Sequence, residues 1–140
     1  GVPGAVAAAL RHPERTVIGF VGDGGILMTG NELATARAFG ARPKIVISDN
    51  RSYGTIRLHQ ERDYPDRVAG TDLTNPDFAL WARSFGIEGA TLAKGDEVAG
   101  AVAAFLAADG PAVLAVRSSA QAISAYTTIA GLHERMRKAG

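Results

Sequence analysis

Cysteine is absent from this sequence of 140 residues, which excludes disulfide scaffolds and thiolate metal sites and is compatible with a reducing cytoplasm. An excess of charge is missing too, because 15 Lys and Arg residues against 14 Asp and Glu residues leave a net charge of +1. That balance gives no basic surface for nucleic acid or for an acidic membrane. No apolar run reaches the length of a membrane span. We therefore expect a cytoplasmic domain whose partners include neither nucleic acid nor membrane.

Several common ligand-binding patterns are missing as well. A dinucleotide fingerprint needs a third glycine where Leu27 stands, and no P-loop sequence occurs. The three histidines, His12, His59 and His133, have no metal-ligand spacing. The chain begins with Gly1 rather than methionine, so we expect it to be a piece of a longer polypeptide.

Hydrophobic residues make up 46% of the chain and charged residues 21%, a balance typical of one globular domain with its own core. Residues 16–21 and 44–48 are apolar and β-branched, as in buried parallel strands, and residues 27–39 between them have helical spacing. Further helices are predicted at 2–10, 76–85, 96–108 and within 121–140, and further strands at 91–93 and 112–116. This order predicts an α/β fold, a three-layer α/β/α domain with a mostly parallel central sheet.

Polar, glycine-rich turns follow the first two predicted strands. The first turn has the sequence Gly-Asp-Gly-Gly at residues 22–25, and the second begins with Asn50. Parallel pairing would place Asp23 and Asn50 side by side at the carboxyl edge of the sheet, where open α/β sheets bind ligands. Carboxylate and amide oxygens suit Mg²⁺, and glycines and a helix beginning near Leu27 suit an anion. The sequence thus predicts a site for Mg²⁺ and a diphosphate.

The same residues carry a resemblance to a known family. Gly-Asp-Gly at residues 22–24, followed by Asn50 after an apolar strand, resembles the thiamine diphosphate motif. Residues 32–36 and 53–57 are similar to the acetolactate synthase and 2-oxoacid decarboxylase family. The resemblance implies that residues 1–140 form the C-terminal, diphosphate-binding (PP) domain of a longer enzyme. That enzyme would use thiamine diphosphate and Mg²⁺ to decarboxylate or ligate 2-oxoacids.

The resemblance also implies roles for individual residues. The side chains of Asp23 and Asn50 and the backbone carbonyl of Ser52 are the implied Mg²⁺ ligands. No catalytic side chain is implied within the chain, because the family's activating glutamate lies on a separate pyrimidine-binding domain. The implied cofactor-binding residues, of which the last two would lie near the thiazolium and the substrate, are Gly22, Asp23, Gly24, Gly25, Asn50, Ser52, Tyr53, Gly54, Thr55 and Ile56.

The partners that the resemblance implies are a small 2-oxoacid substrate and a pyrimidine-binding domain of the same or a neighbouring subunit, in a homo-oligomer. Without that domain we expect the chain to be inactive, and to self-associate through the apolar surface left exposed. A non-catalytic assembly or regulatory module of the same fold is the alternative. Which 2-oxoacid is used, and whether by decarboxylation or ligation, stays open.

Two positions depart from the family pattern. Asp49 and Gly25 stand where many relatives have asparagine and serine, and neither change removes an implied ligand. Asp49 adds a negative charge beside the predicted metal site, and we expect its side chain to point away along the strand. Trp81, in the helix predicted at residues 76–85, is expected in the core or an interface rather than at the cofactor.

Two polar segments leave alternatives open. Residues 59–67 have no clear period and predict an excursion over the site. They would form either a substrate-covering loop, with contacts from Arg57, His59 or Gln60, or a solvated connection. The tail at residues 121–140 has an amphipathic pattern typical of a helix that packs on its own domain or on a partner subunit.

Overall fold

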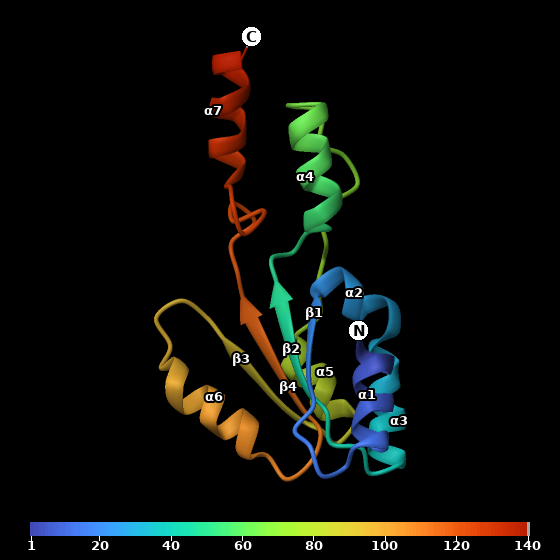
Figure 1. The fold of residues 1–140 in the computed structure, drawn as a ribbon. Coiled ribbons are helices and arrows are strands. Elements are labelled where there is room, and N and C mark those ends of the chain that lie inside the picture. The colour runs from blue at the N-terminus through green and yellow to red at the C-terminus, as the bar shows by residue number, and fades with distance from the viewer. Residues whose placement is uncertain (140) are drawn as a thin grey trace.

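The computed structural model describes residues 1–139 and has a parallel sheet at its centre (Figure 1). Its strands are β1 (Ile18–Gly22), β2 (Lys44–Asp49), β3 (Glu88–Leu92) and β4 (Ala112–Arg117). They lie in the spatial order β1-β2-β4-β3, and each pairs in parallel with its neighbour. The two strands predicted from apolar, β-branched runs are therefore β1 and β2, and they are adjacent as expected.

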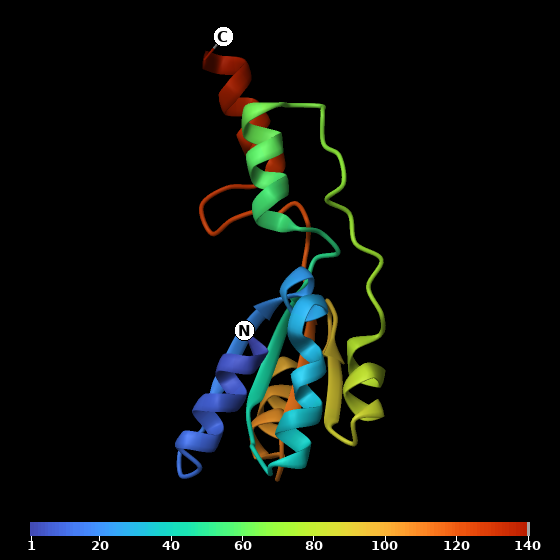
Figure 2. The same cartoon turned by 90° about the vertical axis from the view of Figure 1, so that its right-hand side faces the viewer.

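Helices cover both faces of the sheet. They are α1 (Val2–Arg11), α2 (Asp23–Thr29), α3 (Leu33–Ala38), α4 (Gly54–Asp63), α5 (Phe78–Ser84), α6 (Val98–Ala107) and α7 (Ile129–Ala139), with a 3₁₀ turn η1 (Gly30–Glu32) before α3. One face carries α1, α2, α3 and α5, and the other carries α6 (Figures 1 and 2). The predicted three-layer α/β/α architecture is confirmed. In both views α4 and α7 stand beyond the carboxyl edge of the sheet.

Alternating side chains of the central strands fill two cores. Ile45 and Ile47 of β2 join the larger core, which includes Leu33 of α3 and Phe78 of α5. Val46, between the two isoleucines, packs against the smaller core on the side of α6. Successive side chains of a strand point to opposite faces, so a run of apolar residues is what a strand buried on both faces requires.

The α6 face is covered only in part. Phe105 of α6 packs against Leu92 and Leu114, but Phe20 on the edge strand β1 is 77% exposed. An apolar groove of about 370 Å³ lies there, with Ile18 and Phe20 on one side and α6 on the other. The described residues therefore leave an apolar part of the sheet on the surface.

The helix after β1 begins earlier than the sequence predicts. It begins at Asp23, directly after β1, and not near Leu27. A short 3₁₀ turn then interrupts it at Gly30, where a Cβ atom would lie 2.1 Å from the ring of Trp81. The ring of Trp81 packs against the larger core, as predicted, and the close approach of the two helices requires glycine at that position.

The polar segment that was expected to be an excursion is helical in its first half. Residues 54–63 form α4, so the expectation of an irregular segment from His59 is wrong there. Arg57 and Glu61, one turn apart, approach to 3.3 Å, and His133 Nε2 of α7 lies 2.7 Å from the buried Glu61 carboxylate. The tail thus packs on a helix of its own chain, and α7 supplies the contacts that a polar α4 lacks by itself.

Two helix details also differ from the prediction. α5 begins after an Asp77 cap, whose carboxylate accepts the Leu80 backbone N–H, so Pro76 precedes the helix and is not its first residue. On α6, Val102 and Phe105 pack against the smaller core, whereas Val98 and Leu106 are exposed. Within residues 1–139, no helix has the length and hydropathy needed to cross a membrane.

Candidate functional site

The two polar turns meet at the carboxyl edge of the sheet. β1 and β2 pair so that Gly22 lies opposite Ser48. Asp23 therefore follows β1 at the level at which β2 ends in Asp49, with Asn50 next along the chain. This arrangement is the predicted one, in which parallel strands bring distant turns together.

Asp23 is buried and each of its carboxylate oxygens has a different environment. Its side chain is 2% exposed. Oδ2 accepts two hydrogen bonds, from the backbone N–H of Arg51 at 2.6 Å and from Nδ2 of Asn75 at 2.8 Å. Oδ1 accepts one, from the adjacent Gly24 N–H at 2.9 Å. Oδ1 is thus the oxygen with capacity left for a further partner.

The second turn is fixed by its own hydrogen bonds. The side-chain oxygen of Asn50 accepts the Ser52 N–H at 3.0 Å, a local turn typical of asparagine. Ser52 Oγ donates to the Thr71 carbonyl at 3.0 Å, and the Tyr53 N–H donates to the same carbonyl at 2.8 Å. The chain around Ser52 is therefore held against residues 71–73, and the Ser52 side chain is turned toward that segment.

A pocket of about 220 Å³ lies between the two turns. It brings together nine of the ten predicted cofactor-binding residues, all except Asn50, whose Nδ2 atom lies beside Gly54. The contacts of these residues with a cofactor stay a prediction. The pocket is lined by Gly22, Asp23, Gly24, Gly25, Ser52, Tyr53, Gly54, Thr55 and Ile56.

The glycines of the first turn allow close packing around this pocket. A Cβ atom at Gly24 would lie 2.5 Å from the ring of Tyr53, so the ring can pack on this turn only if residue 24 is glycine. A Cβ atom at Gly22 would meet no other atom within 4 Å, so the space beside it is open. At Gly25 a Cβ would lie 3.0 Å from Val21, which must shift slightly to admit a larger residue such as serine.

Asn75 was not predicted as a residue of the site, and it enters the site from the segment before α5. Its Nδ2 atom donates to Asp23 and also to Asp49 Oδ1 at 2.7 Å. The expectation that Asp49 points away from the site is wrong, because the Asn75 amide joins its buried carboxylate to that of Asp23. Arg51, whose backbone N–H donates to Asp23, was also not predicted as a residue of the site. Its backbone conformation marks it in the folded chain, since a φ of 57° is rare for a residue other than glycine.

The side chains proposed to touch a substrate are engaged within the chain instead. Arg57 contacts Glu61 and Asp72, and His59 Nδ1 lies 2.9 Å from a guanidinium nitrogen of Arg62. The Gln60 amide forms two hydrogen bonds with the backbone of Ala69, which ties the following loop to α4. These contacts favour a structural role for the segment.

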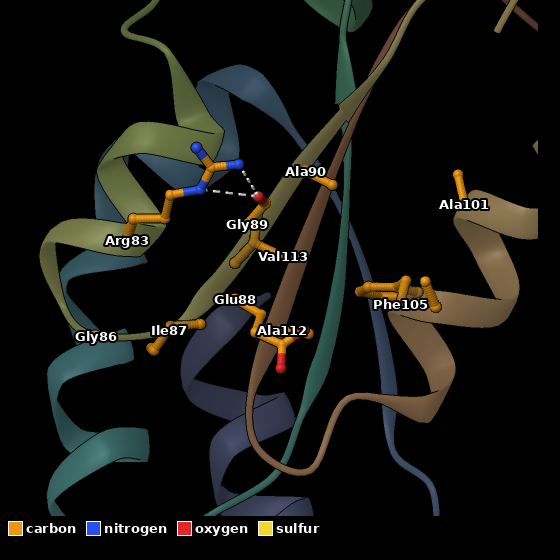
Figure 3. A pocket seen from close by; sticks show the side chains of 11 residues that line it. Arg83, Gly86, Ile87, Glu88, Gly89, Ala90, Ala101, Phe105, Ala112 and Val113 are labelled. Atoms are coloured by element: carbon orange, nitrogen blue, oxygen red, sulfur yellow. Dashed lines mark hydrogen bonds between the residues drawn. The ribbon is translucent and has the colours of Figure 1, made fainter.

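A larger pocket, of about 560 Å³, lies between α5 and α6 at the amino ends of β3 and β4. Figure 3 shows that the guanidinium of Arg83 in this pocket donates to the Gly89 carbonyl, at 2.8 and 3.2 Å. Glu88 is the other charged residue that lines it, among small and apolar ones such as Ala101 and Phe105. The Arg83 guanidinium is bound to a backbone carbonyl, and the pocket does not lie at the carboxyl ends of the strands. It therefore offers fewer polar groups to a ligand than the carboxyl edge does.

The donor set at the carboxyl edge limits which metals fit. Within residues 1–139, no three His, Cys, Asp or Glu side chains gather closely enough to hold a metal. A cation there would depend on the Asp23 carboxylate, the Asn50 amide oxygen and a backbone carbonyl. Such hard oxygen ligands suit Mg²⁺ when phosphate oxygens complete the coordination.

Comparisons with known proteins show which family the chain resembles. Residues 1–116 match the family model described as "Thiamine pyrophosphate enzyme, C-terminal TPP binding domain". The chain is 38% identical over 117 residues to the acetolactate synthase isozyme 2 large subunit of Escherichia coli (strain K12), covering 83% of this chain and 21% of that protein. It is 36% identical over 118 residues to the acetolactate synthase large subunit of Parasynechococcus marenigrum (strain WH8102), covering 83% of this chain and 19% of that protein. The chain thus spans about a fifth of the length of these relatives.

Solved structures give the same fold. A 4-hydroxybenzoylformate decarboxylase of Rhodococcus jostii RHA1, thiamine diphosphate-dependent, matches with a TM-score of 0.75 and 31% identity, over 85% of this chain and 23% of that one. The benzoylformate decarboxylase of Polynucleobacter necessarius matches with a TM-score of 0.77, over 85% of this chain and 23% of that one. Its identity of 24% supports the fold alone.

Proposed function

Since this chain belongs to the family of thiamine pyrophosphate enzymes, as the C-terminal domain that binds the cofactor, we propose that it holds the cofactor's diphosphate through Mg²⁺. We place it in a larger enzyme that decarboxylates or ligates 2-oxoacids. The observation that carries the proposal is the pocket at the carboxyl edge, which is lined by nine of the ten predicted residues, the buried Asp23 among them.

The residues present fit Mg²⁺ and a diphosphate. Asp23 Oδ1, the Asn50 side-chain oxygen and the Ser52 carbonyl are hard oxygen donors on two adjacent turns, as Mg²⁺ requires. The space beside Gly22 is open, and any larger residue at position 22 would extend its side chain into that space. Glycine at this position therefore leaves room for a group of the ligand. The backbone N–H of Gly25, in the first turn of a helix, suits the negative diphosphate, whereas that of Gly24 donates to Asp23 Oδ1.

Thiamine diphosphate, when bound, supplies a nucleophilic carbon on its thiazolium ring and an electron sink for the decarboxylation of a 2-oxoacid. The share of this chain is to bind and orient the cofactor. Thr55 and Ile56 lie at the rim of the pocket and are exposed, which suits positions that face the thiazolium and the substrate. The activating glutamate is proposed to come from a pyrimidine-binding domain of the same or a neighbouring subunit in a cytoplasmic homo-oligomer.

Calorimetry on the full-length protein that contains this domain tests the proposal. Thiamine diphosphate should bind only when Mg²⁺ is present, and Asp23→Ala should abolish both binding and turnover of 2-oxoacids. Asp109→Ala is the matched control, because Asp109 is an exposed carboxylate paired with Arg42 at the opposite edge of the sheet. Unchanged binding in Asp23→Ala would refute the proposal.

The alternative, a non-catalytic assembly or regulatory module, predicts a different result. In that case the full-length protein would turn over neither pyruvate nor other 2-oxoacids, and it would lack the glutamate of the pyrimidine-binding domain. The polar residues of both turns are intact, which favours the enzyme.

A further inference from the structure

Two buried carboxylates lie at neighbouring strand ends with a single amide between them. Asp23 follows β1 and Asp49 ends β2, and they are 2% and 3% exposed. Nδ2 of Asn75 lies 2.8 Å from Asp23 Oδ2 and 2.7 Å from Asp49 Oδ1. Carboxylate oxygens accept hydrogen bonds, and the neutral Asn75 amide offers one N–H to each of the two side chains, so it joins them without adding charge.

The orientation of the Asn75 amide follows from its neighbours. If the amide were flipped, its oxygen would face two carboxylate oxygens and no hydrogen would lie between them. In the observed orientation both hydrogens of Nδ2 are used, while the buried Oδ1 has no hydrogen-bond partner among the described residues. A buried acceptor without a partner is costly. The two carboxylates, and not the surroundings of Oδ1, therefore determine how this side chain lies.

The bridge decides which oxygen of Asp23 remains available. Oδ2 accepts from both Asn75 and the Arg51 N–H, whereas Oδ1 accepts only from Gly24, a residue that lines the pocket. We infer that Asn75 is a positioning residue that turns the Asp23 carboxylate so that Oδ1 is presented to the cation. This inference rests on the proposed function, since the cation is the Mg²⁺ of the diphosphate site.

Asp49 serves as the anchor of this bridge. Its other oxygen, Oδ2, lies 3.5 Å from a guanidinium nitrogen of Arg117, its register partner on β4. A chain of contacts therefore runs from β4 through Asp49 and Asn75 to Asp23. Asp49 thus has a role in the inference, because it fixes the amide that orients the Asp23 carboxylate.

Other residue types would not replace Asn75. Aspartate would place a third carboxylate beside two others, and serine would offer a single hydrogen for two acceptors. Partners that orient a metal ligand in this way typically contribute about 10–100-fold to metal affinity. We expect a loss of that size when Asn75 is replaced.

The test compares Asn75→Ala with Asp77→Ala in the full-length protein. Asp77 caps α5 two residues further on, so its loss should destabilise the same segment without touching either carboxylate. Thiamine diphosphate binding is measured by calorimetry over a Mg²⁺ series, and the melting temperature is measured in parallel. Asn75→Ala should raise the half-saturating Mg²⁺ concentration about 10-fold or more, with cofactor binding recovered at high Mg²⁺. Asp77→Ala should leave that concentration within about 2-fold of the unmodified protein.

The outcomes separate the inference from the proposed function. If the unmodified protein binds the cofactor in a Mg²⁺-dependent way and Asn75→Ala has an unchanged Mg²⁺ requirement, the positioning role is refuted and the proposed function stands. If the unmodified protein shows no Mg²⁺ dependence, both are refuted. Should Asn75→Ala fail to fold, Asn75→Ser, which keeps one donor, decides the question by the same measurement, with a raised Mg²⁺ requirement expected and an unchanged one overturning the inference.

Discussion

The backbone N–H of Arg51 donates a hydrogen bond of 2.6 Å to Asp23 Oδ2, from 28 residues further along the chain. Arg51 does so in the left-handed conformation, with a φ of 57°. Its carbonyl in turn accepts the N–H of Leu73 at 2.9 Å. The unusual conformation therefore joins the ends of two strands to the segment that carries Asn75.

Substitution of Arg51 tests how much this conformation matters for stability. Arg51→Val should lower the free energy of unfolding by about 1–3 kcal/mol, because a β-branched residue is strained at positive φ. Arg51→Gly should change it by less than about 1 kcal/mol, since glycine adopts this conformation freely. Urea unfolding measures the free energy of unfolding of both variants. Arg15→Val, at an exposed position outside the left-handed region, is the control, and an equal effect of valine at both positions would contradict the prediction.

The contact between α4 and α7 gives a second prediction. His133→Ala removes one of the two partners of the buried Glu61 carboxylate, the one on α7. Residues 129–138 should then exchange their amide hydrogens faster, by about 1–3 kcal/mol in opening free energy. The amide hydrogens of the sheet should stay as protected against exchange as in the unmodified protein. Lys138→Ala breaks only an exposed pair with Glu134 and should have little effect. Equal exchange in the two variants would show that the Glu61 contact does not hold α7.

The uncovered part of the sheet predicts how residues 1–140 behave alone. We expect this chain to self-associate in light scattering, because Phe20 and its apolar neighbours face solvent. Phe20→Lys should reduce the association. Phe39→Lys is a close control, since Phe39 is 72% exposed but does not line the groove. A monodisperse unmodified chain would contradict the prediction.

Lys44 predicts a pH dependence of stability. Burial lowers the pKa of this lysine below its ordinary value of 10.5, and its Nζ donates to the carbonyls of Ala108 and Gly110. Between the lowered pKa and 10.5 the unfolded chain binds more protons, so folding becomes more favourable as pH rises. The neutral amine keeps two hydrogens for the two carbonyls. The free energy of unfolding of the unmodified protein relative to that of Lys44→Met should therefore increase as the pH rises toward 10.5, measured by urea unfolding at a series of pH values. A decrease would contradict it.

The sequence predicted those parts of the fold and of the site that depend on local patterns. Buried strands are visible as apolar runs, and the motif from Gly22 to Asn50 placed the two turns correctly because parallel strands bring their ends together. α4 was missed because its stabilising partner, His133, is 72 residues from Glu61. Helix propensity and period carry no information about such a contact.

The missed residues of the site have the same cause. Asn75 meets Asp23 across 52 residues, and only the folded chain shows that one amide bridges two strand ends. Asp49 was misplaced because alternation along a strand says which face a side chain takes, but not how the last residue of the strand turns. Such contacts at the end of a strand need the structure.

The most direct test is a crystal structure of the full-length protein with thiamine diphosphate, with Mn²⁺ replacing Mg²⁺ so that anomalous scattering locates the cation. We expect a single peak within about 2.0–2.3 Å of Asp23 Oδ1, the Asn50 side-chain oxygen and the Ser52 carbonyl, with the diphosphate on the same ion. A diphosphate bound elsewhere, or a cation that leaves Asp23 uncoordinated, would contradict it.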